Sequence, residues 1–506
     1  MSNNKRIAKN TAFLYIRMIL IMGVTLYTSR IILDKLGIDD YGLYNVVGGV
    51  VGILSFLNGT LSTGTSRFLT FELGTGNKER LTRTFSTAFY THLILTIIIF
   101  IIMETIGLWF LYHELVIPIE RLNACFWVFQ MSILTTAIAI TQVPYTAIIM
   151  AHERMGVYAY VSIFEAFAKL SVCFLLSISD VDKLILYAIL LASVQFMVAM
   201  FYRIYCIRKF EESKLRYIFD KSIFRSMMGF SGWNIMANLA ETLRLQGVLI
   251  LINQFFNPMV VAAQAVANQV ANAMMQFVFN FRAAINPQII KLYAAGNKDA
   301  SKQLTLSSTV YCFDLILLLG LPCIFVSDKL LNLWLVEVPE YAVVFTQLII
   351  ISKILSTFSV AFYVPMMAAN RMKSNSIAAV YIGIGEFVLL YFLLEMGFGV
   401  MWVQYLGIMM TSAFSFIIKP YILNKEIDYS LKELLDCYWK CAKVSIVSLI
   451  ISIPISRCFN DSLWHSLLLM CIVASSVIVS SYIFMEKETK NKLYIYIKNK
   501  ISNQHQ

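Results

Sequence analysis

The chain has 506 residues, of which 59% are apolar and 14% are charged, and its formal net charge is +11. Its mean hydropathy is +0.71. A soluble domain has too little interior to hide that many apolar side chains, so the composition excludes a soluble protein and predicts an all-α polytopic membrane protein. The positive charge lies in the loops between apolar stretches, so it does not indicate a nucleic-acid partner.

Apolar stretches long enough to cross a hydrocarbon core of roughly 30 Å recur along the whole chain. The basic N-terminus leads into the first stretch, which is too long for the apolar core of a signal peptide and is interpreted as a retained span. The pattern predicts about fourteen transmembrane helices. Their expected ranges are 13–33, 41–70, 85–110, 122–150, 156–178, 184–206, 224–253, 258–290, 305–327, 341–369, 375–396, 399–423, 439–457 and 463–485.

The loops between these spans alternate in charge. The N-terminus, every second loop and the C-terminal tail carry Lys and Arg, most densely in the loop from Arg203 to Arg225. The other loops are acidic or nearly uncharged, as at Asp39 and Asp40. Because cytoplasmic loops collect Lys and Arg, the alternation predicts that both termini are cytoplasmic.

Two segments of the chain repeat each other at an offset of 220 residues (76 to 296). Residues 296–299 (GNKD) repeat residues 76–79 (GNKE), and the apolar run 260–290 matches the run 40–70 in hydropathy. Internal repetition predicts two lobes of the same architecture. The expected parts are an N-lobe of helices 1–6 (1–207), a cytoplasmic linker (208–223), a C-lobe of helices 7–12 (224–424), and two further helices with a basic cytoplasmic tail (425–506).

Two prolines lie at matching places in the predicted lobes. Pro144 and Pro365 interrupt the fourth and the tenth span near their cytoplasmic ends. Proline removes a backbone N–H and frees a carbonyl group, which suits a gate. A fixed kink in a packed bundle is the alternative interpretation.

Ionisable side chains inside the spans are candidate functional groups because they are costly to place in a membrane. The basic residues outnumber the acidic ones on the helices that open the two lobes. This imbalance predicts a cationic cavity between the lobes, and the planar guanidinium group of Arg suits a pyrophosphate group. The candidate cavity residues are Arg17, Arg30, Arg67, Arg244, Arg282 and Lys353, and the candidates for ion coupling are His92, Glu104, Glu165 and Glu386.

Several of these residues also have a structural interpretation. Arg17 and Arg30 lie near span ends, from which their side chains can reach the membrane interface. Arg67 can pair with Glu72. The spacings Glu165 to Lys169 and Glu241 to Arg244 are those of helical ion pairs.

The remaining candidates need partners that the local sequence does not supply. Arg282 and Lys353 have no acidic residue within one helical turn. His92, Glu104 and Glu386 are either proton sites or packed, hydrogen-bonded structural groups.

The sequence contains no signal for catalysis or for a resident cofactor. The nine cysteines show neither a CxxC motif nor a metal-ligand spacing, and no Walker motif occurs. No loop is long enough for a soluble catalytic domain, so we expect a protein that is not an enzyme. A membrane-embedded polymerase or acyltransferase would need a large non-cytoplasmic loop or a surface His/Asp pair. The energy source is left open, with an H⁺ or Na⁺ gradient as the hypothesis.

The opening of the chain resembles that of the Wzx-type polysaccharide flippases. The resemblance consists of Arg30, Leu36-Gly37, residues 41–44 (YGLY), residues 67–69 (RFL) and the loop at residues 76–78 (GNK). These flippases belong to the multidrug/oligosaccharidyl-lipid/polysaccharide exporter superfamily, together with the MATE exporters and the lipid II flippase. The resemblance implies a two-lobe bundle that alternates between inward and outward states, with its basic cavity at Arg30 and the other candidate arginines.

The resemblance also implies a substrate and a location. The expected cargo is an undecaprenyl-pyrophosphate-linked oligosaccharide, moved from the cytoplasmic to the periplasmic leaflet of a bacterial inner membrane for O-antigen, lipopolysaccharide or capsule synthesis. The expected partners are this lipid-linked oligosaccharide, membrane lipids and other polysaccharide-assembly membrane proteins. Residues 439–485 match in size and place the two extra helices that line a lipid groove in the lipid II flippase. A MATE-like ion-coupled drug antiporter is the alternative, although its site would require more acidic residues.

Overall fold

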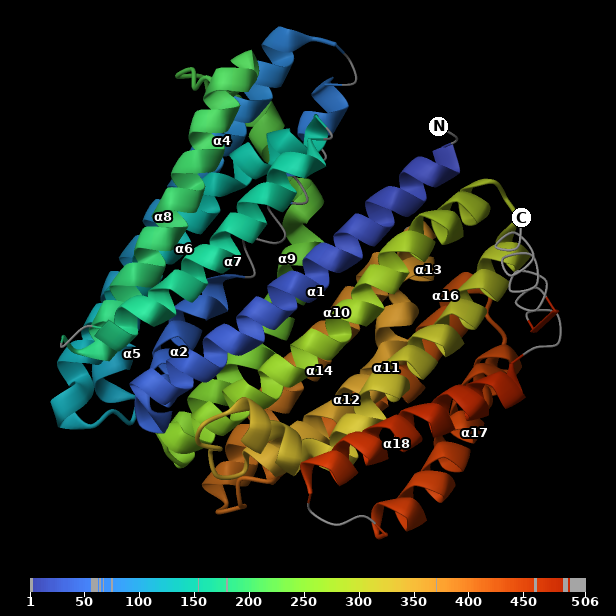
Figure 1. Cartoon of the computed structure of the whole chain (residues 1–506). Helices are drawn as coiled ribbons and strands as arrows, with labels where there is room; N and C mark the ends of the chain where they lie inside the picture. The colour runs from blue at the N-terminus through green and yellow to red at the C-terminus, as the bar shows by residue number, and fades with distance from the viewer. Residues whose placement is uncertain are drawn as a thin grey trace, which may run out of the picture. The chain divides into compact units, whose positions relative to one another are not determined.

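The structure, a computed structural model, is helical throughout its described part, as the composition predicts. It describes residues 3–55, 62, 65, 66, 68–73, 76–152, 154–178, 181–369, 371–458, 462–485, 490 and 491. The helices are α1 (Asn3–Leu36), α2 (Ile38–Gly52), α4 (Lys78–Ile102), α5 (Leu108–His113), α6 (Leu122–Ala151), α7 (Met155–Ile178), α8 (Lys183–Lys209), α9 (Lys221–Phe255), α10 (Pro258–Ala294), α11 (Lys298–Trp334), α12 (Ala342–Ala361), α13 (Tyr363–Ala368), α14 (Met372–Glu395), α15 (Trp402–Ala413), α16 (Lys419–Ile427), α17 (Leu431–Ser456) and α18 (Leu463–Phe484) (Figure 1).

Short turns of other helical types complete the described elements. Single 3₁₀ turns lie at Ile53–Ser55, Ile119–Arg121 and Glu211–Ser213, and π-helical turns lie at Met103–Gly107 and Phe414–Ile418. The expected span 341–369 is divided into α12 and α13 at Phe362, which Pro365 explains because it cannot donate the helical hydrogen bond. The spans 85–110 and 399–423 each contain a π-helical turn that the sequence pattern did not predict.

Within the described residues, ten helical runs are long and apolar enough to cross a membrane. The four other expected spans coincide with α1, with α2 and the residues after it, with α9 and with α10, so the number fourteen is not confirmed. Most of the helices extend beyond the apolar runs. For example, α11 spans Lys298–Trp334, whereas its apolar run was expected at 305–327.

The two loops of the sequence repeat have the same local geometry. Gly76 has a φ of 72° and Gly296 has a φ of 80°, a left-handed conformation that glycine adopts without strain. The next residue caps the following helix in both loops: Asn77 Oδ1 accepts from the backbone N–H of Arg80 at 3.0 Å, and Asn297 Oδ1 accepts from that of Ala300 at 3.2 Å. The repeated GN sequence therefore ends one helix and begins the next in the same way twice.

The chain divides into two compact units. Unit 1 consists of residues 1–269, 334–342 and 376–406, and unit 2 consists of residues 270–333, 343–375 and 407–506. These bounds differ from those of the expected lobes, and the division into 1–207 and 224–424 stays a prediction.

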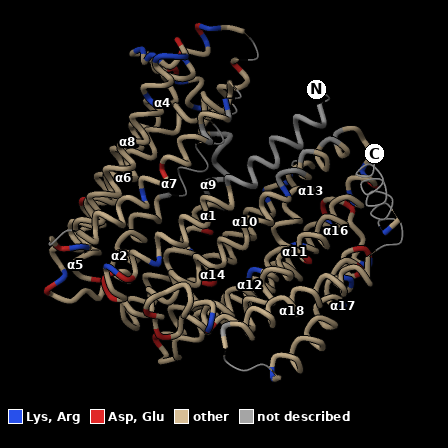
Figure 2. The backbone as a smooth tube through the Cα atoms, viewed as in Figure 1, with Lys and Arg blue, Asp and Glu red and all other residues tan. Residues whose placement is uncertain are grey.

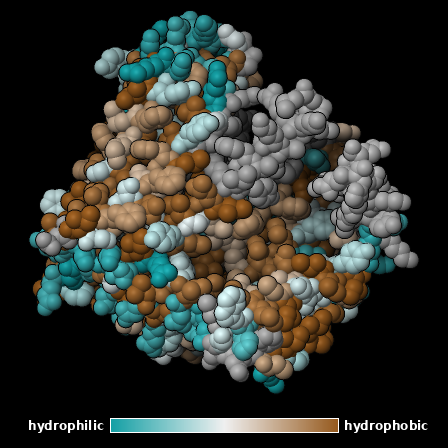
Figure 3. Space-filling view, in the orientation of Figure 1, coloured by the Kyte–Doolittle hydropathy of each residue, from teal (hydrophilic) through white to brown (hydrophobic). Residues whose placement is uncertain are grey.

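In unit 1, α6 is the central helix of a bundle. It packs along α8 and also contacts α2, α4 and α7, while α1 packs on α7 (Figure 1). Charged residues concentrate toward the ends of α4, α6 and α8 (Figure 2). The flank between those ends is hydrophobic (Figure 3). Exposed large apolar side chains of α4 and α8 include Phe100, Phe196 and Phe201. This arrangement is that of a surface covered by lipid tails.

Glycines allow very close helix contacts in unit 1. A Cβ atom on Gly42 of α2 would lie 2.0 Å from the carbonyl oxygen of Pro258, the first residue of α10. A Cβ atom on Gly383 of α14 would lie 2.7 Å from the carbonyl oxygen of Ala240 on α9. Small residues at such contacts let helix backbones approach closely in membranes. These glycines therefore allow α2 to pack closely against α10, and α14 against α9.

In unit 2, an aromatic cluster joins α11, α12, α17 and the π-helical turn at 414–418. The ring of Phe358 lies 4.8 Å from that of Tyr438, 5.2 Å from that of Phe313 and 5.4 Å from that of Phe416. α17 and α18 form a hairpin with extensive mutual contact. α17 begins with a capping box in which Ser430 and Glu433 satisfy each other's backbone N–H groups.

Candidate functional site

The candidate site lies in unit 2, where the chain breaks between α12 and α13. Pro365 has no N–H to give to the carbonyl group of Ala361, four residues earlier. Arg282 of α10 takes this role, because its Nη2 donates to the Ala361 carbonyl oxygen at 2.9 Å. Its Nη1 lies 4.0 Å from Cys312 Sγ on α11. Two residues singled out in the sequence, Arg282 and Pro365, are thus linked through one backbone carbonyl group.

A second buried cation lies on the other side of the same break. Lys419, at the start of α16, is 2% exposed, and its Nζ donates to Asn375 Oδ1. The same Nζ lies 5.0 Å from the ring centre of Phe414 and 5.7 Å from that of Tyr363 in α13. The π-helical turn Phe414–Ile418 immediately precedes Lys419. Cation–π contacts and one amide oxygen therefore hold the ammonium group.

Neither of these cations is compensated by a nearby acid in the described part of the chain. Arg282 is 3% exposed, and no carboxylate of the described residues lies within 4 Å of Arg282 or of Lys419. A buried charge without a counter-ion is costly, and that cost falls when an anion binds. The arrangement can therefore attract an anionic group to the break between α12 and α13. Among the described residues, no group of His, Cys, Asp and Glu could hold a metal ion.

In unit 1, Arg244 is part of an ion-pair cluster. Its guanidinium group binds Glu241 through two hydrogen bonds, of 2.8 and 3.1 Å, as the i,i+3 spacing on α9 predicts. Glu386 of α14, which is 4% exposed, lies 3.8 Å from Arg244 Nη1. The close contact of Gly383 with Ala240 holds α9 and α14 at this distance. Arg244 is compensated by two carboxylates and so adds little positive charge to a cavity.

The other candidates for ion coupling have local partners. Glu165 pairs with Lys169 at 2.6 Å on α7, as their i,i+4 spacing predicts. Glu104 lies in the π-helical turn after α4 and accepts from Gln130 Nε2 at 3.3 Å. His92 is fully buried, with its Nδ1 2.7 Å from the carbonyl oxygen of Ala88. A role in ion coupling stays a prediction for all of them.

In the described part of the chain, none of the contacts of Arg282 and Lys419 given above involves the remaining sequence candidates. Arg30 on α1 and Lys353 on α12 are half-buried. The side chain of Arg17 and the whole of Arg67 lie outside the described residues. Pro144 is buried within α6, which continues through it without interruption.

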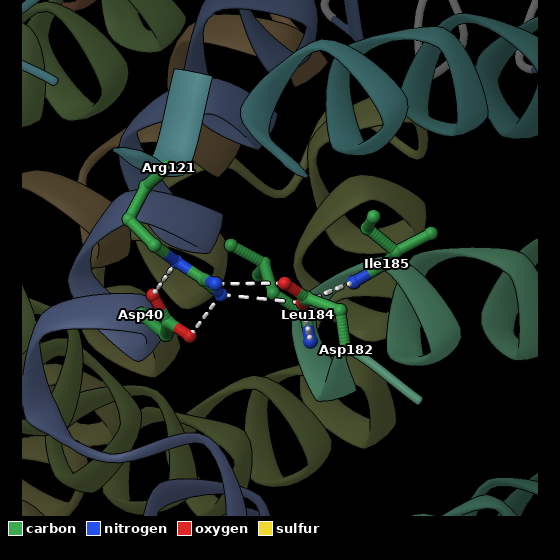
Figure 4. A network of polar contacts seen from close by, with 5 residues as sticks. All are labelled: Asp40, Arg121, Asp182, Leu184 and Ile185. Atoms are coloured by element: carbon green, nitrogen blue, oxygen red, sulfur yellow. Dashed lines mark hydrogen bonds and ion pairs between the residues drawn. The ribbon is translucent and has the colours of Figure 1, made fainter. Parts of the chain in front are cut away.

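An ion network joins three elements at one end of unit 1. Arg121 donates from Nε to Asp40 Oδ1 of α2 at 2.9 Å, and from Nη1 to Asp182 Oδ2 at 2.7 Å (Figure 4). Asp182 also caps α8 by accepting from the backbone N–H groups of Leu184 and Ile185. The network ties α2, α6 and α8 together, on the side where the loops are acidic.

The two carboxyl groups of this network respond differently to their surroundings. Burial raises the pKa of Asp40 above its usual range, and the hydrogen bond from Arg121 only partly opposes this. Burial acts in the same direction on Asp182, but the hydrogen bonds from Arg121 and from the start of α8 outweigh it and lower the pKa of Asp182. Asp182 is therefore the carboxylate that the fold stabilises in its charged form.

Sequence reasoning missed three charged residues that the structure places in polar contacts or pockets. Lys419 and Asp314 lie inside the expected spans 399–423 and 305–327, and their presence in an apolar run is a signal in itself. Arg121 is the only basic residue between the third and fourth expected spans, in an otherwise acidic loop. Its two carboxylate partners, Asp40 in the first turn of α2 and Asp182 at the start of α8, are distant in the sequence, so only the fold brings them together.

Comparison with known proteins identifies the fold. No protein-family model and no curated protein matches the chain. Its structure is similar to that of the lipid II flippase MurJ in an inward closed conformation, with a TM-score of 0.69 at 13% sequence identity, over 94% of this chain and 98% of the other. It is also similar to an inward-facing multidrug resistance MATE family transporter of the MOP superfamily, with a TM-score of 0.63 at 12% identity, over 80% of this chain and 99% of the other.

A further MATE structure, in the straight conformation, has a TM-score of 0.60 at 14% identity and matches 83% of this chain and 96% of its own. At these low identities the likeness is one of fold. The chain is thus an all-α membrane protein with a MATE- and MurJ-like fold, as the resemblance in the sequence implied.

Proposed function

We propose that this protein is a flippase that moves an undecaprenyl-pyrophosphate-linked oligosaccharide from the cytoplasmic to the periplasmic leaflet of a bacterial inner membrane, for surface polysaccharide synthesis. Its partners are this lipid-linked oligosaccharide and membrane lipids. The observation that carries the proposal is the pair of buried, uncompensated cations, Arg282 and Lys419, at a break in a membrane helix.

The charge of the site favours an anionic cargo. A pyrophosphate group carries negative charge over several oxygens, which Arg binds in bidentate fashion and Lys binds as a point charge. A cationic drug would be repelled by the same two side chains. Because Arg244 is compensated by Glu241 and Glu386, Arg282 and Lys419 are the residues of the described part that we expect to contribute most to binding.

The C-terminal hairpin supports a lipid cargo. Residues 425–506, which contain α17 and α18, make up about one sixth of the chain. The MATE matches leave about that fraction of the chain uncovered, whereas the match to the lipid II flippase MurJ covers 94% and so extends into the hairpin. The more complete match to a lipid flippase favours a lipid-linked substrate.

Gene deletion in the host tests the proposed function. We expect the lipid-linked repeat unit to accumulate, as detected by mass spectrometry of extracted lipids, and surface polysaccharide to be lost. Complementation with the wild-type chain should reverse both effects, whereas Arg282→Ala and Lys419→Ala should not, although both variants insert into the membrane. Complementation with Lys425→Ala, which removes an exposed cation of the same helix α16, is the matched control and should succeed.

The MATE likeness defines the competing outcome. If deletion leaves surface polysaccharide unchanged and increases sensitivity to cationic dyes, the protein is a drug antiporter and the flippase proposal is wrong. In that case Arg282 and Lys419 would have structural roles alone.

A further inference from the structure

A pocket in unit 2 lies between α11 and the hairpin of α17 and α18. Its volume is about 220 Å³, and its wall combines apolar side chains with charged ones. Glu433 and Asp436, in the first turns of α17, are exposed at its outer part. This end lies among loops whose basic residues predict the cytoplasmic side. None of the functional residues described above lines this pocket.

Asp314 lies at the inner part of the pocket. It belongs to the apolar stretch of α11, about 14 Å along the helix from the beginning of the expected span at residue 305. Its Oδ1 atom is buried and makes no close hydrogen bond with a described residue, and Ser481 of α18, whose Oγ is also buried, is its polar neighbour. Both residues line the pocket. An intramembrane carboxyl group that lines a pocket and has a serine hydroxyl as its polar neighbour can be reached by a ligand from that pocket.

Titratable groups of α17 and α11 lie around the pocket that Asp314 lines. From α17 these groups are Glu433, Asp436, Lys440 and the thiols of Cys437 and Cys441, and α11 adds Tyr311. Two exposed carboxylates at the outer part attract cations into the pocket. Among the described residues, no group of three or more His, Cys, Asp and Glu side chains could hold a metal ion, and we therefore take a proton as the ligand.

We propose that Asp314 is a proton-binding site, reached through the pocket between α11, α17 and α18, that couples transport to the proton gradient. A proton from water in the pocket adds to the carboxylate and forms the neutral acid, and the reverse step returns it to water. The neutral form is the one that an apolar surrounding favours, so gain and loss of this proton change how α11 packs against the hairpin. The coupling rests on the proposed transport function, whereas the proton-binding site itself does not.

Chemical labelling tests the site independently of transport. The probe is dicyclohexylcarbodiimide, which reacts with a protonated carboxyl group in an apolar surrounding, applied to the full chain in lipid nanodiscs. Peptide mapping by mass spectrometry should find the label on Asp314, in an amount that falls as the pH is raised, and little label on exposed Glu433 and Asp436. Absence of label on Asp314 at every pH would overturn the proposal.

Transport in proteoliposomes tests the coupling. We expect an imposed pH gradient to accelerate flipping of a lipid-linked oligosaccharide by the wild-type chain. Asp314→Asn, which keeps the shape of the side chain, should lose this acceleration. Asp314→Glu, which keeps a carboxyl group, should retain part of it. Asp299→Asn, which neutralises an exposed carboxylate in the first turn of the same helix, should retain all of it.

The outcomes separate the two proposals. If the wild-type chain flips no lipid at all, the proposed function fails, while the labelling still decides whether Asp314 binds a proton. If the wild-type chain flips lipid and Asp314→Asn responds to the gradient as the wild type does, the coupling role of Asp314 is wrong and the flippase proposal stands.

Discussion

The contact between Arg282 and the Ala361 carbonyl group makes a quantitative prediction. Pro365 deprives that carbonyl of its helical donor, and Arg282 replaces the donor at 2.9 Å. A buried carbonyl group left without a donor costs about 1–3 kcal/mol. Arg282→Met, which keeps an apolar stem of similar length, should therefore leave the Ala361 carbonyl group without a donor and lower the free energy of unfolding by that amount. Removal of a buried charge acts in the opposite direction and offsets part of this loss.

The combination with Pro365→Ala isolates this contact. Alanine at position 365 restores an N–H that can reach the Ala361 carbonyl, so Arg282 is no longer needed as its donor. In the Pro365→Ala background, Arg282→Met should therefore lower the free energy of unfolding by about 1–3 kcal/mol less than it does in the wild type. The same charge is removed in both backgrounds, so the cost of burying it cancels in the difference.

The assay is equilibrium unfolding of the four proteins in mixed detergent micelles, followed by circular dichroism. A double-mutant cycle yields the coupling free energy between positions 282 and 365. Strict additivity, with a coupling free energy within about 0.5 kcal/mol of zero, would refute the reasoning. A matched pair, Arg282→Met with Pro322→Ala, should be additive, because Arg282 does not contact the backbone freed by Pro322 of α11 in the described structure.

Three further predictions address packing, pH and buried charge. Gly383→Ala would bring a Cβ atom within 2.7 Å of the Ala240 carbonyl oxygen, so we expect α9 and α14 to separate and the melting temperature to fall. Asp182→Asn keeps a helix-capping side chain but removes the charge that Arg121 stabilises. Because folding lowers the pKa of Asp182, the variant should be less stable than the wild type at pH 7, and this difference should vanish as the pH falls through the lowered pKa. A loss of stability that does not depend on pH would contradict this. Lys419→Met replaces a buried, uncompensated cation and should raise the melting temperature while export is lost, whereas Lys425→Met, at an exposed position of the same helix, should change neither.

The fold class was predictable because the membrane imposes a simple rule. Every backbone polar group in lipid must be satisfied within its own helix, so long apolar runs of the sequence become helices. The i,i+4 pair of Glu165 with Lys169 was predictable as well, because its spacing on a helix brings the two side chains together. The two GNK loops, which the sequence showed only as a repeat, have the same glycine conformation and asparagine cap. These features depend on neighbours within a few residues along the chain.

The site was only partly predictable, because its contacts join distant parts of the chain. The sequence indicated that Arg282 needs a partner from elsewhere, but a backbone carbonyl such as that of Ala361 leaves no trace in residue type. The same holds for the contact of Arg244 with Glu386, which depends on how closely glycine lets α9 and α14 approach. Lys419 lies near the end of its expected span, where a lysine is usually taken to reach the membrane surface, yet its own surroundings are two aromatic rings and an amide.

The most direct test of the central claim is a flipping measurement with the purified chain. Proteoliposomes would carry a fluorescent undecaprenyl-pyrophosphate-linked oligosaccharide, and a membrane-impermeant periodate treatment would report the fraction of glycan exposed on the outer leaflet over time. We expect the wild-type chain to make the protected fraction accessible, whereas Arg282→Ala and Lys419→Ala should not. Equal rates in empty liposomes and in proteoliposomes of the wild-type chain, with transport of a cationic dye by the same preparation, would show that the protein is not a flippase.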